Sequence, residues 1–490
     1  MPVRDEGIGR KAVGGFLWAL AGFLIMQVGS FATYTYATRV LGTAGIAVVG
    51  TALTVVFWID ILLDLGMGAS LIYEQERGQT HRVAVAFTVN VVVATTIAAF
   101  VALGAGPIDR FFKVGDIDIF RVVALLIAVK GLGQVPDALL KRDLDFRRRA
   151  ASDLTRSTLR FVIAVALLKA GVGPIAMVIA VAVAEVAAVA VTWILVRFRP
   201  RFRFDKAVAT EMLRFGAAMF GARLVGMLWL NGDYLVITHH FGGRSKQFGN
   251  YFTAFRLPEL VLGSVYNLFS NVAFPAYAAA RERGAATLRT ASLKSLRMLC
   301  LFGFPAGFGM SLVARDFIGG WFGAEFAGAV PVMEWLCAAA AFVAVGYASG
   351  DLYAAIGKPR LGLYFNLVFA PVLVAGFVAV VGRGVVAIAM VHLAVIIPYS
   401  MFRIEVANRL LGTTWSQSLG ALRPATAATL GMVALALPVR LLLAQGWASM
   451  FAIVAAGATG MLAGLAVGDR ATLGELLQGG RSGLARLGLR

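Results

Sequence analysis

Long apolar runs separated by short polar segments dominate this chain from one end to the other. A helix needs about 20 consecutive apolar residues to cross a bilayer, and windows of that width find fourteen such runs. The pattern therefore predicts an all-α, polytopic membrane protein with about 14 transmembrane helices. The windows lie near residues 14–38, 44–65, 83–103, 119–140, 153–169, 173–196, 212–238, 253–279, 292–314, 332–354, 361–380, 385–404, 421–439 and 447–467.

A weak internal repeat divides these windows into groups. Leu41-Gly42 closes the first window and Phe241-Gly242 closes the seventh, and each pair precedes a short loop and a window with charged residues. An offset near 200 residues is typical of transporters built from two related halves. The expected domains are an N-terminal six-helix bundle in 1–200, a second six-helix bundle in 201–410, and two additional helices with a basic cytoplasmic tail in 411–490.

Composition excludes a soluble globular domain. The chain is 59% hydrophobic and 14% charged, with a mean hydropathy of +0.81, whereas soluble domains hold about 25% charged residues. Cys300 and Cys337 both fall in apolar runs, so we expect core residues and not a disulfide or a metal site. The four histidines lack ligand spacing, and no metal centre is expected. The first apolar run lacks a small-residue cleavage site and is interpreted as a retained span.

The net charge of +19 is explained by a membrane and not by a nucleic-acid partner. Alternate loops hold about three times as many Lys and Arg residues as the loops between them. This bias places both termini in the cytoplasm, in a multi-pass protein of the cell (inner) membrane. The densest basic runs, residues 141–149 and 197–206, then lie on the cytoplasmic side, where we expect contact with anionic membrane lipids.

Charged residues inside the N-terminal windows are the first functional candidates, because a charge at the bilayer centre costs about 2.5–3.5 kcal/mol on insertion scales. Asp60 and Asp64 share one face of a helix. Asp64 lies near a helix end, whereas Asp60 is one turn deeper and is a candidate for lining a cavity. Lys130 lies near the middle of the fourth window, and we expect it to face an aqueous interior with Asp137 as a distant partner.

Three further charges lie in the fifth and sixth windows. Arg156 and Arg160 share a face close to a cytoplasmic end, so we expect them to reach lipid headgroups. Glu185 lies well inside the sixth window, where we expect a protonated carboxyl group in a hydrogen bond between helices.

Polar residues also interrupt the seventh and eighth windows. They are Arg223, Asn231 and Asp233 in the seventh window, and Arg256, Glu259, Asn267 and Asn271 in the eighth. One interpretation is a structural ion pair of Arg256 with Glu259 or with Asp233. The other is a cationic cavity for an anionic ligand, since the planar fork of arginine suits phosphate oxygens. An ion pair alone does not explain the surplus of Arg223, Arg256 and Lys130.

The sequence holds no motif for an enzyme. It lacks the phosphate-binding GxxxxGK[ST] loop, the HExxH zinc motif and the GxSxG nucleophile motif. A glycosyltransferase would need a soluble domain or a large extracytoplasmic loop, and the longest such loop, 315–331, is too short. We therefore expect a protein that is not an enzyme and has no cofactor.

Several stretches together resemble the polysaccharide-transport flippases of the multidrug/oligosaccharidyl-lipid/polysaccharide superfamily. They are RVLGTAGIAVVG (39–50), DLGMGASLI (64–72), VPDALLKRDLDFRRRA (135–150), NGDYLVITHHFG (231–242), FGNYFTAFRLPEL (248–260), NVAFPAYA (271–278), WFGAEFAGAVPVMEWL (321–336) and AAIGKPRLGLYFNLV (354–368). The resemblance implies two six-helix bundles in a V plus two C-terminal helices. It also implies movement of an undecaprenyl-diphosphate-linked oligosaccharide from the cytoplasmic to the outer leaflet. Two departures are a thinned asparagine run, Asn231-Gly232-Asp233, and the presence of Lys130.

The resulting hypothesis assigns a role to each buried polar residue. Substrate binding falls to Arg223, Arg256, Lys130, Asn231, Asn267 and Asn271, and ion coupling to Asp60, Asp233 and Glu259. A proton or sodium gradient is a candidate energy source, and polysaccharide polymerase and glycosyltransferases are candidate partners beside the undecaprenyl-diphosphate glycolipid. The alternatives are a cation-coupled multidrug antiporter, which would need an acidic cavity, and a membrane scaffold that transports nothing.

Overall fold

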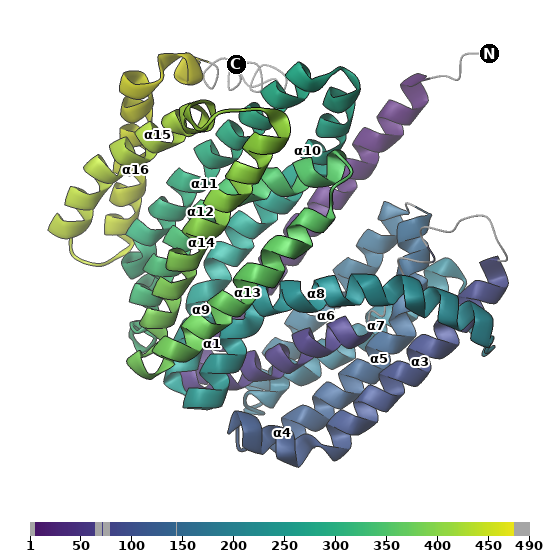
Figure 1. The fold of residues 1–490 in the computed structure, drawn as a ribbon. Helices are drawn as coiled ribbons and strands as arrows, with labels where there is room; N and C mark the ends of the chain where they lie inside the picture. The colour runs from purple at the N-terminus through teal and green to yellow at the C-terminus, as the bar shows by residue number, and fades with distance from the viewer. Residues whose placement is uncertain (1–4, 64–70, 72–78, 144, 475–490) are drawn as a thin grey trace. The chain divides into compact units, whose positions relative to one another are not determined.

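In the part of the chain that the computed structural model describes, all regular secondary structure is helical (Figure 1). That part comprises residues 5–63, 71, 79–143 and 145–474, without the side chains of 5–26, 79–80, 146, 215–219, 222, 257, 260, 267–268 and 271. The all-α prediction is therefore confirmed. The chain forms two compact units, Met1–Gly249 and Asn250–Arg490. The expected division into bundles near residues 200 and 410 stays a prediction.

The N-terminal unit is built around the helix that fills the fourth window. The helices of this unit are α1 (Asp5–Leu63), α3 (Gln79–Leu103), α4 (Ala105–Phe112), α5 (Ile117–Arg142), α6 (Phe146–Lys169), α7 (Ile175–Val196), α8 (Lys206–Phe241) and the start of α9 (Lys246–Pro258). Ile119 and Phe120 of α5 are fully buried against Val48 and Ala52 of α1 and Ala182 of α7. These apolar contacts hold the charged residues of α1, α5 and α7 at fixed positions.

A kink at Gly42 divides α1 into two helical segments, which correspond to the first two windows. Gly42 lies inside α1 with φ 64° and ψ −174°, a conformation that is essentially restricted to glycine. Gly242 ends α8 with φ 89°, so both positions of the internal repeat use a glycine with positive φ. A side chain at Gly249 would lie 2.0 Å from the carbonyl oxygen of Thr43. The start of α9 therefore packs directly against the kink.

The C-terminal unit is also built from long helices. Its elements are the π-helical turn Glu259–Gly263 and the helices α10 (Ser264–Glu282), α11 (Ala285–Trp321), α12 (Ala329–Ala355), α13 (Arg360–Val380), α14 (Val385–Leu411), α15 (Trp415–Leu442) and α16 (Trp447–Gly468). Cys300 and Cys337 are both fully buried free thiols, which confirms them as core residues.

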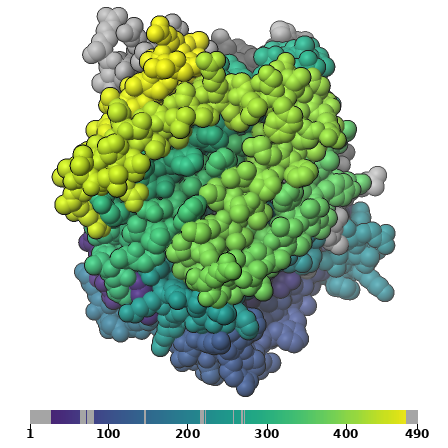
Figure 2. Space-filling view, turned by 60° about the vertical axis from the view of Figure 1, so that its left-hand side comes forward, coloured from purple at the N-terminus to yellow at the C-terminus, as the bar shows by residue number. Residues whose placement is uncertain are grey.

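The last two helices pack backbone against backbone. A Cβ at Gly464 would lie 2.2 Å from the carbonyl oxygen of Ala427, and one at Gly460 would lie 2.2 Å from that of Gly431. Small residues of this kind let transmembrane helices approach closely. Figure 2 shows one face of the molecule, on which much of this half of the chain is visible. Large apolar side chains of α15 and α16, such as Leu441 and Phe451, are 75% and 65% exposed. We interpret these side chains as lipid-facing.

Every one of the fourteen windows coincides with a helix, although ten helices of the described residues are long and apolar enough to span a bilayer. The first two windows count as one of these ten, Gln27–Leu63. The fifth, seventh and eighth windows, in α6, α8 and α9–α10, fall outside the ten. These three carry the arginines and asparagines that lower mean hydropathy, and they are therefore also the segments with candidate functional residues. The short helix α4 was too brief for the window analysis to predict.

Candidate functional site

An ion pair links Lys130 of α5 to Asp60 in the second half of α1. The Nζ atom of Lys130 lies 2.8 and 2.5 Å from the two carboxylate oxygens of Asp60. The side chains of Lys130 and Asp60 keep 22% and 37% of their exposure. The partner expected for Lys130 was wrong, since Asp137 instead binds Lys141 at 2.6 Å. Residues four apart on α5 satisfy Asp137 locally, whereas the α1–α5 packing brings Asp60 to Lys130.

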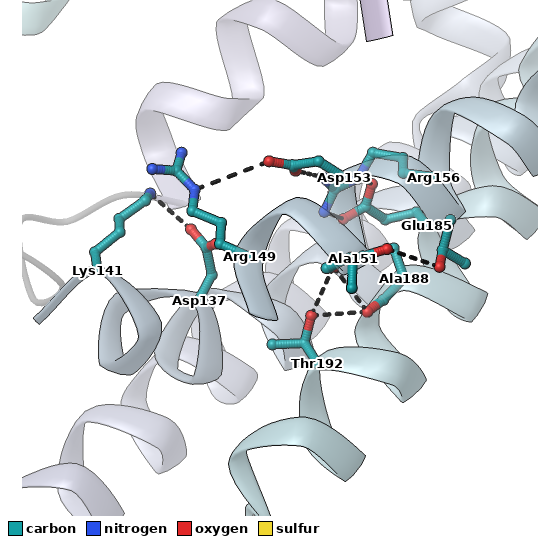
Figure 3. A network of polar contacts seen from close by, with 11 residues as sticks. Asp137, Lys141, Arg149, Ala151, Asp153, Arg156, Glu185, Ala188 and Thr192 are labelled. Atoms are coloured by element: carbon teal, nitrogen blue, oxygen red, sulfur yellow. Dashed lines mark hydrogen bonds and ion pairs between the residues drawn. The ribbon is translucent and has the colours of Figure 1, made fainter. Parts of the chain in front are cut away.

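A second network joins α6 to α7 (Figure 3). Nε and Nη2 of Arg156 donate to the two carboxylate oxygens of Glu185, at 2.9 and 3.3 Å, and Nη1 donates to Asp153 at 2.7 Å. Arg149 extends the network to Asp153 at 4.0 Å. The expected hydrogen bond of Glu185 between helices is therefore confirmed, with Arg156 as its partner, and contact of Arg156 with lipid headgroups stays a prediction. A bidentate contact between a guanidinium and a carboxyl group is a strong one, so it links α6 firmly to α7.

The seventh window contains a break at its polar residues. Asn231 has φ −139° and ψ 17°, outside the helical range, and its Nδ2 atom lies 3.1 Å from the sulfur of Met227. Asp233 is fully buried, and one of its carboxylate oxygens accepts the backbone N–H of Tyr234 at 2.8 Å. Arg223, two turns earlier on α8, is exposed. The break separates the exposed cation from the buried acid, so the helix does not present them on one continuous face.

Arg256 and Glu259 form the ion pair that opens the eighth window. Their closest atoms, Nη1 and Oε2, are 3.0 Å apart, and the side chains are 35% and 52% exposed. The pairing with Glu259 is therefore confirmed as one of the two proposed for Arg256. Pro258 lies between them and cannot donate a backbone hydrogen bond, and a π-helical turn begins directly after it. Arg256 belongs to the C-terminal unit, whereas Lys130 and Arg223 belong to the N-terminal unit.

Three predicted residues cannot be placed. Asp64 lies outside the described residues, and so do the side chains of Asn267 and Asn271, whose backbone belongs to α10. Within the described ranges, no group of three His, Cys, Asp or Glu residues is arranged to hold a metal ion.

Sequence reasoning missed two partly buried arginines of the C-terminal unit. Arg440 of α15 forms an ion pair with Glu334 of α12, and Arg403 of α14 donates to Ser349 and Tyr399. Both arginines lie at the edge of an apolar window, so the charge pattern assigned them to loops. The signal available in the sequence was the helical spacing of Tyr399 and Arg403, four residues apart.

Comparison with known proteins identifies the family. Residues 37–331 match a family described as "Polysaccharide biosynthesis protein", which is more than half of the chain. The chain belongs to this family. The resemblance to polysaccharide-transport flippases of the multidrug/oligosaccharidyl-lipid/polysaccharide superfamily is thus confirmed.

Two similar relatives of this polysaccharide biosynthesis protein come from bacteria. The teichuronic acid biosynthesis protein TuaB of Bacillus subtilis is 24% identical over 63% of this chain and 63% of TuaB. The lipopolysaccharide biosynthesis protein WzxC of Escherichia coli is 24% identical over 75% of each chain. The match thus spans just under two thirds of TuaB and three quarters of WzxC.

Solved structures show the same fold. The lipid II flippase MurJ, in an inward closed conformation, has a TM-score of 0.74 at 12% identity and covers 92% of this chain and 98% of its own. An inward-facing multidrug resistance MATE family transporter has a TM-score of 0.63 at 14% identity, covering 81% and 99%. At these identities the likeness establishes the architecture, a multi-pass membrane transporter fold, and not the substrate.

Proposed function

We propose that this protein is a flippase that moves an undecaprenyl-diphosphate-linked oligosaccharide from the cytoplasmic to the outer leaflet, for surface polysaccharide assembly. Its family supports a role in polysaccharide biosynthesis. Relatives named for teichuronic acid, lipopolysaccharide and succinoglycan biosynthesis support a glycan substrate. The fold shared with a lipid II flippase supports a lipid carrier. Such movement makes and breaks no covalent bond, so the protein acts as a transporter and not as an enzyme.

The observation that carries the proposal is that basic side chains within the helices stay accessible. Lys130 and Arg256 are each paired with an acid, yet their side chains are 22% and 35% exposed, and Arg223 is exposed. A diphosphate can therefore reach these three cations, and arginine binds phosphate oxygens in a bidentate manner. The remaining proposed substrate ligands are Asn231, Asn267 and Asn271, which would bind sugar hydroxyls.

Transport would proceed by alternating access around a cationic site. Asp60, Asp233 and Glu259 are the proposed coupling residues for a proton or sodium gradient. Asp60 forms an ion pair with Lys130, and Glu259 forms one with Arg256. An anionic headgroup would compete with each carboxylate for its basic partner. A negative interior also favours outward movement of a bare diphosphate, by about 2.3 kcal/mol per charge at 100 mV.

The membrane setting of the proposal includes orientation and partners. Both termini would be cytoplasmic, and basic loops would bind anionic lipids. The polymerase and the glycosyltransferases that make and extend the glycan are the proposed protein partners.

The second candidate is a cation-coupled multidrug antiporter, which the likeness to a multidrug transporter favours. An antiporter would need Asp60 for efflux of organic cations, whereas a flippase would need Arg256 for export of the glycan. These two dependences separate the candidates.

The test uses a deletion strain and mass spectrometry of its lipid extract. We expect an undecaprenyl-diphosphate glycan to accumulate in the strain and to disappear when the wild-type chain is restored. Arg256→Ala should restore surface polysaccharide at least tenfold less than wild type, by loss of a charge-assisted phosphate contact worth about 1.5–3 kcal/mol. Arg409→Ala, which removes an exposed helix-end arginine, is the matched control. Normal polysaccharide with Arg256→Ala, together with drug efflux that fails in Asp60→Asn, would establish the antiporter instead.

A further inference from the structure

The guanidinium group of Arg403 lies between α12 and α14, in a seat formed by Ser349, Tyr353 and Tyr399. Its Nε donates to the hydroxyl of Ser349 at 2.9 Å, and its Nη1 donates to the hydroxyl of Tyr399 at 2.9 Å. The guanidinium carbon lies 5.3 Å from the ring centre of Tyr399 and 6.0 Å from that of Tyr353. Two hydrogen bonds and two aromatic faces thus fix the plane of the group.

Glycine residues of α12 provide the space for this arginine. A Cβ at Gly350 would lie 2.7 Å from Nη2 of Arg403, and one at Gly346 would lie 3.6 Å from its Cδ. The side chain therefore crosses α12 where two glycines, four residues apart, leave its surface flat. Tyr399 is held in turn, because its hydroxyl donates to Asn366 of α13 at 3.0 Å. The seat is built from three helices.

Arg403 forms no ion pair among the described residues, although Asp351 lies near enough to interact with its charge. Lys130, Arg156, Arg256 and Arg440 each form an ion pair with a carboxylate, whereas no described carboxylate lies within ion-pair distance of Arg403. Asp351, beside Gly350, accepts a hydrogen bond from Ser270 instead, at 2.7 Å. A guanidinium carries five N–H donors, and Nη2 has no protein acceptor among the described residues. Nη2 is not completely buried, so it keeps some exposed surface.

The side chain of Arg403 does not extend toward the nearer headgroups. Arg403 lies eight residues before the end of α14 at Leu411, about 12 Å along the helix axis. A snorkelling arginine would extend toward that end. The guanidinium instead reaches back to Tyr399, one turn deeper. Lys358, just before α13, and Arg360, its first residue, are both exposed. Asn366, the seventh residue of α13, belongs to the seat.

We propose that Arg403 binds the phosphate group of a membrane lipid. A planar cation with a free N–H group, held more than two turns inside the end of an apolar helix, matches the oxygens of a phosphate ester. The exposed basic residues at the start of α13 would draw the same anion toward the seat. For a bilayer phospholipid this site would not depend on the substrate proposed above, whereas for a polyprenyl diphosphate it rests on that proposed function. The lipid is either a bilayer phospholipid or a polyprenyl diphosphate.

Binding to the purified full-length protein in detergent tests the proposal. The probes are short-chain phosphatidylglycerol, farnesyl diphosphate and inorganic pyrophosphate, with farnesol as the phosphate-free control. We expect at least one lipid probe to bind wild type, and Arg403→Gln to bind it at least tenfold more weakly. Arg409→Gln, on the same helix but paired with Glu405, should bind as wild type does. Tighter binding of phosphatidylglycerol assigns a bilayer lipid, and tighter binding of farnesyl diphosphate assigns a polyprenyl carrier.

A second variant distinguishes loss of the binding site from misfolding. Gly350→Ala keeps the positive charge but places a methyl group against Nη2, so it should also weaken binding of the lipid probe. Equal affinity of wild type, Arg403→Gln and Gly350→Ala would overturn the proposal. Arg403 would then have only a structural role, linking α12 to α14. Binding of inorganic pyrophosphate as tight as that of the lipids, or equal binding of farnesol, would overturn it as well.

Discussion

Individual charges in this protein are stable within apolar helices because most of them meet an opposite charge on another helix. Lys130 reaches Asp60, and Arg156 reaches Glu185, across distances of 70 and 29 residues in the sequence. Removing two charges from water is costly, and a close ion pair with further hydrogen bonds offsets that cost. The sequence identified the residues but not these pairs, because periodicity defines the face of one helix and not the neighbour that covers it.

The Lys130–Asp60 pair predicts a measurable coupling. Asp60→Asn and Lys130→Gln should each lower the free energy of unfolding by about 1–3 kcal/mol, because each leaves a half-buried charge without its partner. The double variant should recover part of that loss, with a coupling energy of about 0.5–3 kcal/mol. Thermal unfolding in detergent measures all four proteins. Asp118→Asn breaks an exposed pair with Arg121 and should change stability by less than about 1 kcal/mol; purely additive effects at Lys130 and Asp60 would contradict the pairing.

The pair of Asp205, which precedes α8, with His81, at the first residue of the span His81–Leu103, predicts a response to acid. The hydrogen bond from His81 at 3.1 Å, with help from the backbone N–H of Val208, holds the pKa of Asp205 below its usual range. Such a carboxylate stabilises the fold above its unfolded pKa of about 3.9, and this stability is lost as the pH falls through the lower folded value. Wild type should therefore have a higher Tm than Asp205→Asn at pH 5, and the difference should vanish by pH 2. Asparagine keeps the helix-capping acceptor, so an unchanged difference across this range would count against the pair.

Helical elements are interrupted where the backbone has a specific reason to break. Gly42 permits the kink of α1, Asn231 leaves the helical range in α8, and Pro258 precedes a π-helical turn. The sequence indicated Pro258 directly, since proline removes a donor. It indicated Gly42 only through the weak repeat with Gly242. The break at Asn231 had no sequence signal, because asparagine is compatible with a helix and its departure depends on tertiary packing.

The kink at Gly42 predicts a backbone-specific loss of stability. Gly42→Ala places a side chain at φ 64° and ψ −174°, and strain at such positions costs about 1–3 kcal/mol. Gly106→Ala is the matched control, because Gly106 is helical in α4 and nothing lies within 4 Å of an added Cβ. That change should be neutral or stabilise by about 0.5–1 kcal/mol. A similar Tm for both variants would show that α1 does not need the glycine conformation.

At the scale of the whole chain, the bilayer made most of the fold predictable. A fixed hydrocarbon thickness requires apolar runs of a narrow length range, and all fourteen windows coincide with helices. The proposed functions depend on residues that interrupt this pattern, such as Arg403. Its position near the edge of a window predicted a loop charge, whereas the structure places it against Ser349 and Gly350 of α12. Contacts between helices are set by packing over long separations, so the seat of Arg403 and the partner of Lys130 had to come from the structure.

The orientation of the whole molecule is the last prediction and can be tested with the protein almost unchanged. The excess of basic residues in alternate loops places residue 207 on the cytoplasmic side and residue 327 outside. Cys300 and Cys337 are fully buried, so the wild-type chain should not react with a membrane-impermeant maleimide. Ala327→Cys introduces an exposed thiol that should be labelled in intact cells. Ala207→Cys, also exposed, should be labelled only after permeabilisation, because the reagent cannot cross the bilayer. Since charge bias alone supports this orientation, the reverse labelling pattern would invert the topology and, with it, the leaflet on which a cytoplasmic glycolipid would first meet the protein.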